Sequence, residues 1–188
     1  MRKTLLIIAL IFLALCPFAN AQNIFEYNKS LEFGLGYSRS GTFAAMRDPK
    51  VTAFDSAHIY LLIYGIYIDA GGRYDKNHTR NVGIEKYDGY KNSYLHVGYA
   101  IPVCRWAKII PNIGYFYWAK GYWDGLDYTV DSNGIVNKFH AEHIYKKFDI
   151  GVTFSATFAK YFNAYVNVTL NNISVGLGAA LSWYDAEQ

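Results

Sequence analysis

The sequence predicts an all-β chain: a closed, antiparallel, eight-stranded transmembrane β-barrel of the up-and-down meander type, preceded by a cleaved signal peptide. Three observations support this fold class. Apolar residues alternate with small or polar ones along several segments, and no long segment after Gln22 has a clear 3.6-residue apolar period. The face opposite the apolar residues is small or polar in most of these segments. The 18 Tyr, 12 Phe and 4 Trp residues suit a boundary between oil and water.

The first 21 residues have the pattern of a secretory signal peptide. Two basic residues precede an apolar run at 4–15, and Ala19-Asn20-Ala21 supplies the small residues of a cleavage site. The run is shorter than the roughly 20 apolar residues that a spanning helix needs, so we expect removal rather than anchoring. An uncleaved anchor and lipidation at Cys16 are the alternatives.

Cleavage leaves one domain, residues 22–188, of ordinary size for a single barrel. Cys104 is then its only cysteine, so the fold holds without an intramolecular disulfide. The leader removes two of the 18 basic residues and none of the 15 acidic ones, leaving 16 against 15. This near balance gives no electrostatic case for binding nucleic acid.

The first three strands are predicted at 29–40, 42–50 and 59–72. In 29–40, Leu31 to Tyr37 alternate with Glu32 to Ser38, and Ser40-Gly41 then allows a tight turn. The segment 42–50 is the weakest of the predicted strands. The third strand is rich in β-branched and aromatic residues, and its parity sets Tyr64, Ile66 and Ile68 against Gly65, Tyr67 and Asp69.

Five more strands follow at 93–103, 109–123, 147–158, 163–170 and 173–183, each with the same two-residue alternation. The last of these, ISVGLGAALSW, has large apolar residues on one face and only Ser, Gly and Ala on the other. Asn171-Asn172 suits a two-residue hairpin turn before it.

The connections alternate in length. The segments 71–92 and 121–146 are predicted to be long exposed loops, whereas 104–108 and 159–161 are short. Counted along the chain, the two long loops follow the third and fifth strands, and the two short joins follow the fourth and sixth. The long loops therefore belong at one end of a barrel and the short joins at the other, as in bacterial transmembrane barrels.

A barrel of eight strands is so narrow that side chains fill its interior, which favours small residues there. The parity of the strands predicts a polar interior and an apolar, lipid-facing exterior, the reverse of a soluble barrel. A paired polar plug is favoured over an ion path, because a buried charge needs a partner. The predicted interior residues are Glu32, Asp69, His96, Asn112, Lys147, Asp149, Asn167 and Thr169, and the predicted lipid-facing residues are Leu31, Phe33, Leu35, Val97, Phe148, Ile150, Val152, Val166, Val175 and Leu177.

Four segments carry a resemblance to a known family: YGIYIDAGG at 64–72, HVGYAIPV at 96–103, IIPNIGYF at 109–116 and the glycine-alternating last strand. With them the chain resembles the small eight-stranded outer-membrane β-barrel proteins of Gram-negative bacteria. The resemblance implies location in the cell outer membrane and contact with the outer-membrane assembly machinery. Such barrels commonly end on an aromatic residue, whereas here four residues follow Trp183-Tyr184.

Metal binding and catalysis are two possible roles for the histidines of this chain, besides a purely structural one. His140 and His143 have a spacing that could offer metal ligands on a helix, but no second cluster completes a site. Some outer-membrane barrels modify lipid A with rim His and Ser residues, and Ser93 and His96 lie near Glu85 and Asp88. No Gly-x-Ser-x-Gly motif occurs, so we predict no catalytic residue, metal or cofactor.

The sequence therefore predicts a non-enzymatic outer-membrane barrel with a structural or surface-interaction role such as adhesion or recognition. Its expected partners are outer-membrane lipid and lipopolysaccharide, the assembly machinery, and an extracellular ligand at the loops 71–92 and 121–146. A secreted soluble barrel for a small apolar ligand and a lipid A-modifying enzyme are the alternatives.

Overall fold

The computed structural model describes residues 28, 30–83, 86–104, 106–124, 139–158 and 161–182. The predicted signal peptide, residues 1–21, lies outside the described residues, as do Glu85 and the segment 125–138. Nine strands and one short helix make up the described part of the chain. In chain order they are β1 Ser30–Ser40, α3 Thr42–Arg47, β2 Phe54–Ile63, β3 Ile66–Gly83, β4 Lys86–Tyr99, β5 Ile101–Cys104, β6 Ala107–Asp124, β7 Phe139–Phe158, β8 Phe162–Thr169 and β9 Asn172–Ser182.

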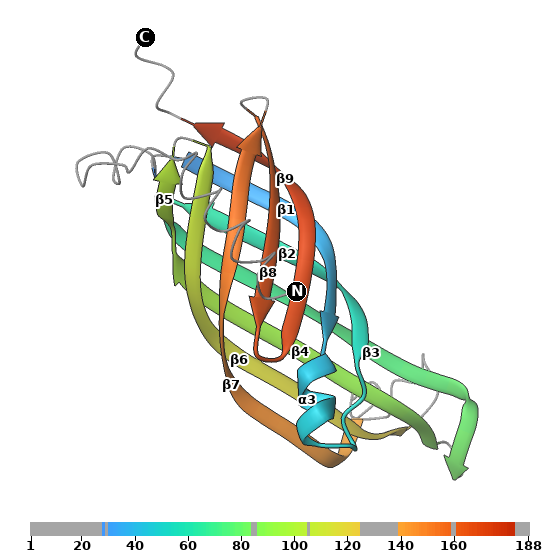
Figure 1. The fold of residues 1–188 in the computed structure, drawn as a ribbon. Coiled ribbons are helices and arrows are strands. Elements are labelled where there is room, and N and C mark those ends of the chain that lie inside the picture. The colour runs from blue at the N-terminus through green and yellow to red at the C-terminus, as the bar shows by residue number, and fades with distance from the viewer. Residues whose placement is uncertain are drawn as a thin grey trace.

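The strands form one closed antiparallel sheet (Figure 1). Apart from β4 and β5, strands that follow each other in the chain pair with each other, and β9 pairs with β1 along its whole length. Both β4 and β5 pair with β6, so these two are one strand interrupted at Ala100. The wall of the barrel therefore has eight strands in meander order. The predicted fold class, a closed eight-stranded antiparallel barrel, is confirmed.

The predicted strand at 42–50 is wrong, because this segment contains the helix α3. Gly41 ends β1 with a positive φ of 82°, a conformation that glycine adopts without strain. The amides of Ala45 and Asp48 then donate to the carbonyls of Gly41 and Ala44, both at 2.8 Å. Alanine and methionine in TFAAMR favour a helix. The segment also lacks the alternation of apolar and polar residues that is typical of a strand with one buried face.

The predicted strand at 59–72 is a hairpin rather than one strand. The chain turns at Tyr64 and Gly65, whose φ values of 48° and 84° suit the two central positions of a type I′ turn. Tyrosine rarely occupies this left-handed region, so the sequence carries no ordinary turn signal here. The predicted faces nevertheless agree with the structure beyond the turn, since Ile66 and Ile68 are exposed whereas Tyr67 and Asp69 are buried.

The predicted loop at 71–92 is strand at residues 71–83 and 86–92, and of the predicted loop at 121–146 the described residues 121–124 and 139–146 are strand. The β3–β4 pairing runs on from Gly71↔Tyr94 to Lys76↔Gly89 and resumes, after irregularities, to Gly83↔Lys86. The β6–β7 pairing likewise extends to Trp123↔Phe139. The sequence 71–92 is rich in glycine and charged residues, so hydrophobic alternation does not reveal its strands, although their backbones pair.

The barrel has two different ends. The joins β2–β3, β5–β6 and β7–β8 are short and lie at one end, here called the turn end, together with the start of β1 and the end of β9. The joins β1–β2, β3–β4, β6–β7 and β8–β9 lie at the opposite, loop end. Figure 1 shows β3, β4, β6 and β7 extending beyond the other strands at the loop end, where α3 also lies. The alternation predicted for the joins is preserved.

Glycines let β1 and β9 approach bulky interior side chains. The register pairs Gly34 with Gly178 and Gly36 with Gly176. A Cβ on Gly36 or Gly176 would overlap the hydroxyl of Tyr165, which occupies the interior at this level. The small face of the last strand therefore makes room for tyrosine rings. No helix among the described residues is long and apolar enough to cross a membrane.

Candidate functional site

The polar interior of the barrel is the first candidate site. Of the eight residues predicted to face it, the structure buries seven almost completely. These come from six different strands, so their side chains meet only because the sheet closes. The seven buried residues are Glu32, Asp69, His96, Asn112, Asp149, Asn167 and Thr169.

Lys147 is the eighth predicted interior residue, and the structure places it on the surface. Its parity is the same as that of Asp149, but β7 has already passed the end of β8, whose pairing begins at Gly151↔Thr169. The inward face of β7 is therefore open at this level. The Lys147 ammonium lies 5.9 Å from the ring centroid of Tyr145 and forms no part of the plug. The prediction that it faces the interior is wrong.

His96 lies between two buried aspartates at the centre of the interior. Its Nδ1 is 2.7 Å from Asp69 Oδ1, and its Nε2 is 3.0 Å from Asp149 Oδ2. A neutral imidazole has one N–H and can donate to only one of these carboxylates, whereas the imidazolium can donate to both. The geometry therefore matches a positively charged ring between two negative groups.

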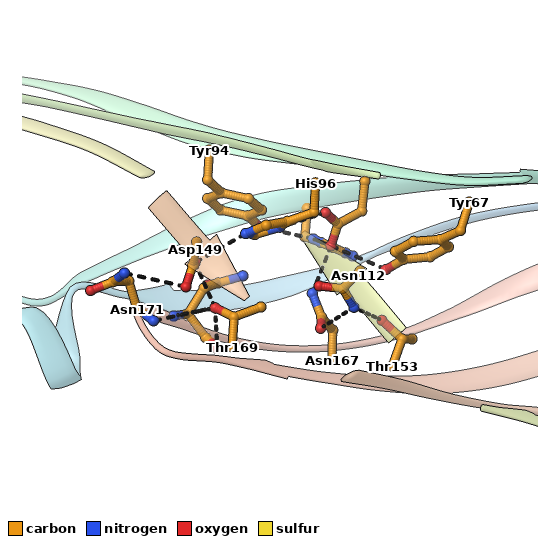
Figure 2. Close-up of polar contacts among 12 residues, drawn as sticks. Tyr67, Tyr94, His96, Asn112, Asp149, Thr153, Asn167, Thr169 and Asn171 are labelled. Carbon is orange, nitrogen blue, oxygen red and sulfur yellow. Dashed lines mark hydrogen bonds and ion pairs between the residues drawn. The ribbon is translucent and has the colours of Figure 1, made fainter. Parts of the chain in front are cut away.

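Neutral side chains complete the hydrogen bonding of both carboxylates (Figure 2). Asn167 Nδ2 donates to Asp69 Oδ2 at 2.8 Å, and the Tyr67 hydroxyl donates to the same oxygen at 3.1 Å. Thr169 Oγ1 donates to Asp149 Oδ2 at 2.7 Å, and Asn171 Nδ2 donates to Asp149 Oδ1 at 3.2 Å. Each charge is thus compensated by hydrogen bonds as well as by an ion pair, as buried charges require.

Asn112 connects this centre to the next level of the interior. Its Nδ2 lies 3.0 Å from Thr153 Oγ1 and 3.3 Å from Asn167 Oδ1. Asn167 in turn contacts Asp69, so the network crosses the barrel from β6 through β8 to β3. Figure 2 shows Asn112, Thr153 and Asn167 gathered on one side of His96.

A second ion pair lies nearer the turn end, between Lys108 of β6 and Glu32 of β1. The Lys108 ammonium also donates to Ser30 Oγ at 2.9 Å. Asn163 Nδ2 donates to the other carboxylate oxygen, Glu32 Oε2, at 2.8 Å and also contacts the Tyr60 hydroxyl. All five side chains are buried.

Sequence reasoning missed Lys108, which was assigned to the short connection 104–108. The structure starts β6 at Ala107, so Lys108 has the same inward parity as Ile110 and Asn112. This shared parity is the sequence feature from which the inward position of Lys108 could have been predicted. His58 was missed for a related reason: it precedes the segment assigned to the third strand, yet it faces inward with its Nδ1 2.8 Å from the Tyr94 hydroxyl.

Aromatic side chains fill the interior at the loop end. Phe116, Trp118 and Tyr145 are buried there in one cluster, against which Ala44 of α3 packs. Trp118 and Phe116 are among the largest completely buried side chains of the described residues. Helix α3 therefore covers the aromatic cluster, and polar layers occupy the barrel beneath it.

Asp48 tethers the end of α3 to β7. Its Oδ2 lies 2.9 Å from His143 Nε2, and its Oδ1 accepts a hydrogen bond from the Lys50 amide at 3.0 Å. The hydrogen bond from Lys50 and then that from His143 hold the pKa of Asp48 below its ordinary value. Both side chains are only partly buried, so the tether is a feature of the rim.

The residues considered for metal binding and for catalysis at the rim do not come together in the structure. His143 contacts Asp48, whereas the ring of His140 stacks on Tyr122. Within the described ranges no group of three or more His, Cys, Asp or Glu side chains could hold a metal ion. Ser93 and His96 occupy opposite parities of β4, so His96 faces the interior and Ser93 shares the outward parity of Leu95. They therefore do not form a joint catalytic site.

The exterior carries the other set of predicted residues. Most of them are exposed apolar side chains, led by Leu35 at 69% and Leu177 at 66% exposure. Exposed apolar side chains also lie on β2, β3, β5 and β6, among them Ile59, Ile68, Ile101 and Ile113, so every strand contributes to an apolar belt around the barrel. Of the predicted lipid-facing set, Phe33, Leu35, Val97, Phe148, Ile150, Val166, Val175 and Leu177 are exposed, and Leu31 and Val152 are half-buried.

A closed antiparallel eight-stranded barrel with a buried polar network inside and exposed apolar side chains outside has the architecture of a small transmembrane β-barrel protein. No protein-family model matches the chain, and no curated protein matches it.

Solved structures with a similar arrangement include two of Ail, the attachment invasion locus protein of Yersinia pestis. The first is 8% identical with a TM-score of 0.48, covering 81% of this chain and 99% of that chain. The second, a complex with the heparin analogue sucrose octasulfate, is 10% identical with a TM-score of 0.46, covering 81% and 97%. Neisserial surface protein A is 9% identical with a TM-score of 0.38, covering 82% and 96%.

Proposed function

We propose that the chain is a non-enzymatic outer-membrane protein whose plugged barrel spans the membrane and whose loop end takes part in surface interactions. The reversed polarity of the barrel is the observation that supports this most strongly. Ion pairs and amides occupy the interior, whereas the exterior exposes Leu, Ile, Val and Phe. Water would have to cover that belt in a soluble barrel, which makes the soluble alternative unfavourable.

The height of the apolar belt suits a bilayer. On β9 the outward set runs from Ile173 to Leu181, close to the 9 to 11 residues that a tilted strand needs to span the hydrocarbon. Exposed aromatic residues border the belt at the turn end, as expected for an interfacial girdle. They include Tyr64, Tyr99, Trp106, Phe158, Tyr161 and Phe162.

Charged residues border the belt at the loop end. Arg39 lies on the outward face two positions beyond Tyr37, and its Nη1 forms a 2.9 Å ion pair with Asp55 of β2. Lys146 has the corresponding place on β7, two positions beyond Phe148. The strands β3, β4, β6 and β7 continue past this border, which supports an exposed surface for an extracellular ligand.

The filled interior argues against a role in solute passage. The ion pairs of His96 with Asp69 and Asp149, the Lys108–Glu32 ion pair and their amide partners block the middle, and the aromatic cluster with α3 blocks the loop end. A stabilising or interactive role therefore fits better than a pore. Export by a leader at 1–21, insertion by the outer-membrane assembly machinery, and contact with lipid and lipopolysaccharide belong to the same proposal.

Membrane fractionation with charge variants tests the proposal. The wild-type chain is expected to leave the membrane fraction only with detergent and to change its gel mobility on heating. Ile150→Arg and Val175→Arg are expected to impair insertion, because a lipid-facing Arg at mid-depth costs about 2 to 4 kcal/mol. Glu142→Arg, exposed on the same face of β7 beyond the belt, is the matched control. Recovery of the wild type in the soluble fraction would overturn the proposal.

A further inference from the structure

We propose that a groove between α3 and β7 binds the phosphorylated headgroup of a glycolipid in the outer leaflet. The groove has a volume of about 690 Å³. The end of α3 and the residues after it form one wall, and an exposed part of β7 forms the other. The lining residues are Arg47, Asp48, Pro49, Ile144, Tyr145, Lys146, Lys147 and Phe148. This inference rests on the proposed membrane location.

The groove exists because β7 is longer than its neighbour β8. Pairing with β8 starts at Gly151↔Thr169, and the Ile150 carbonyl accepts one further hydrogen bond, from the Leu170 amide at 3.1 Å. In the described part of the chain, residues 139–149 pair only with β6. Backbone groups on every second residue point to the same edge of a strand, so Ile144, Lys146 and Phe148 direct amides toward the groove.

Three cations line the groove against one carboxylate. Arg47, Lys146 and Lys147 are all exposed, and none of them forms an ion pair with another described residue. The carboxylate of Asp48 is already engaged by His143 and by the Lys50 amide. The charge left over is positive, and a guanidinium with two ammonium groups is the donor set that a phosphate ester prefers.

The groove lies where the charged rim meets the apolar belt, so its position favours an amphiphilic ligand. Phe148 and Ile144 expose 64% and 46% of their surface beside the cations, and Phe148 continues the apolar belt from Ile150. Lys146 Nζ lies 5.7 Å from the ring centroid of Tyr117, at the border where belt and rim meet. A molecule with phosphates above and acyl chains below would contact the cations and the apolar side chains at once.

An added peptide strand fits the groove less well. An unpaired strand edge attracts other strands, and proteins discourage such pairing with lysines and proline. Here Lys146 and Lys147 lie on the free edge and Pro49 lies across the groove from it. These features disfavour an incoming strand, yet they do not obstruct a headgroup that needs only donors.

The test uses the full mature chain, refolded in non-ionic detergent, with bis-phosphorylated lipid A as the probe and native mass spectrometry as the readout. We expect Lys146→Gln/Lys147→Gln, and separately Arg47→Gln, to weaken binding about tenfold, since each loses charge-assisted hydrogen bonds. Arg39→Gln/Lys91→Gln has the same change of charge at residues that do not line the groove and is expected to bind like the wild type. Heat-dependent gel mobility checks that each variant is folded.

Further binding measurements distinguish a phosphorylated lipid from free phosphate and from a peptide strand. Dephosphorylated lipid A is expected to bind weakly, and inorganic phosphate is expected to compete poorly because it lacks acyl chains. Equal binding of the dephosphorylated lipid, full competition by phosphate, or displacement by an acidic strand-forming peptide would each overturn the inference. Failure of lipid binding by a chain that still fractionates with membranes rejects only this site. Recovery of the chain as a soluble protein rejects the proposed function itself.

Discussion

Nδ1 of His96 lies 2.7 Å from Oδ1 of Asp69, with both side chains buried in the barrel interior. The residues are opposite each other in the β3–β4 register, so the pair is fixed by the sheet itself. Asp149 approaches the other ring nitrogen from β7. One imidazole thus holds together two strands that are not neighbours in the sheet.

His96→Ala is expected to destabilise the barrel strongly. It leaves two buried carboxylates without their shared donor, and breaking a buried ion pair commonly costs about 3 to 5 kcal/mol. The free energy of unfolding, measured by urea titration in lipid vesicles, checks this. Adding Asp149→Asn to His96→Ala should restore part of the loss. Equal stability of His96→Ala and wild type would show that the central ion pair contributes nothing.

Lys108→Met is expected to be far more damaging than Lys147→Met. The first variant leaves Glu32 buried without its cation, a loss of about 3 to 5 kcal/mol, whereas the second alters an exposed side chain. Glu32→Gln/Lys108→Met should recover much of the stability, because the charge is then gone as well. The same urea titration compares all three. A larger effect from Lys147→Met would mean that the partner of Glu32 has been assigned incorrectly.

Gly176→Val is expected to prevent correct assembly. A side chain there would overlap the Tyr165 hydroxyl and the Leu35 carbonyl oxygen, and the backbone cannot move away without breaking the β1–β9 pairing. Leu177→Val, one residue along and pointing outward, is the control and should assemble normally. Heat-dependent gel mobility of membrane fractions measures both. Normal assembly of Gly176→Val would place this face of β9 outside the packed interior.

The tether between α3 and β7 is expected to weaken in acid. Because the folded-state pKa of Asp48 is lowered, its contribution to stability is present above the unfolded pKa of about 3.9 and is lost as the pH falls through the lower folded pKa. Hydrogen exchange at Thr42–Arg47 should therefore accelerate at such pH. Asp48→Asn should show the faster exchange already at neutral pH. Exchange that is independent of pH in the wild type, after correction for intrinsic rates, would contradict this.

The alternation along the strands was sufficient to predict the closed barrel and the faces of most strands. It succeeds at 173–181 because every second residue is small where the barrel is narrow. It fails at 59–72 because Tyr64 adopts a left-handed turn that tyrosine rarely enters. It fails at 74–83 because that part of β3 lies beyond the apolar belt, where neither face has to be apolar.

The composition of the interior network was harder to predict than its polarity. Parity indicates which face a residue occupies, but not which residues meet across the barrel. Glu32 meets Lys108, which is 76 positions away, and Lys147 of the same charge stays outside. Which lysine meets Glu32 depends on the stagger of the strands and on the residue at which β8 ends. Neither can be predicted from the sequence of one strand alone.

The outward direction of the apolar belt is the central claim, and thiol accessibility in intact outer membranes tests it most directly. Val175→Cys and Glu142→Cys are compared in a Cys104→Ser background, with a membrane-impermeant maleimide. Position 142 should react, position 175 should remain unmodified, and both should react after unfolding in urea. Modification of position 175 in the membrane at the rate of position 142 would contradict a lipid-facing belt.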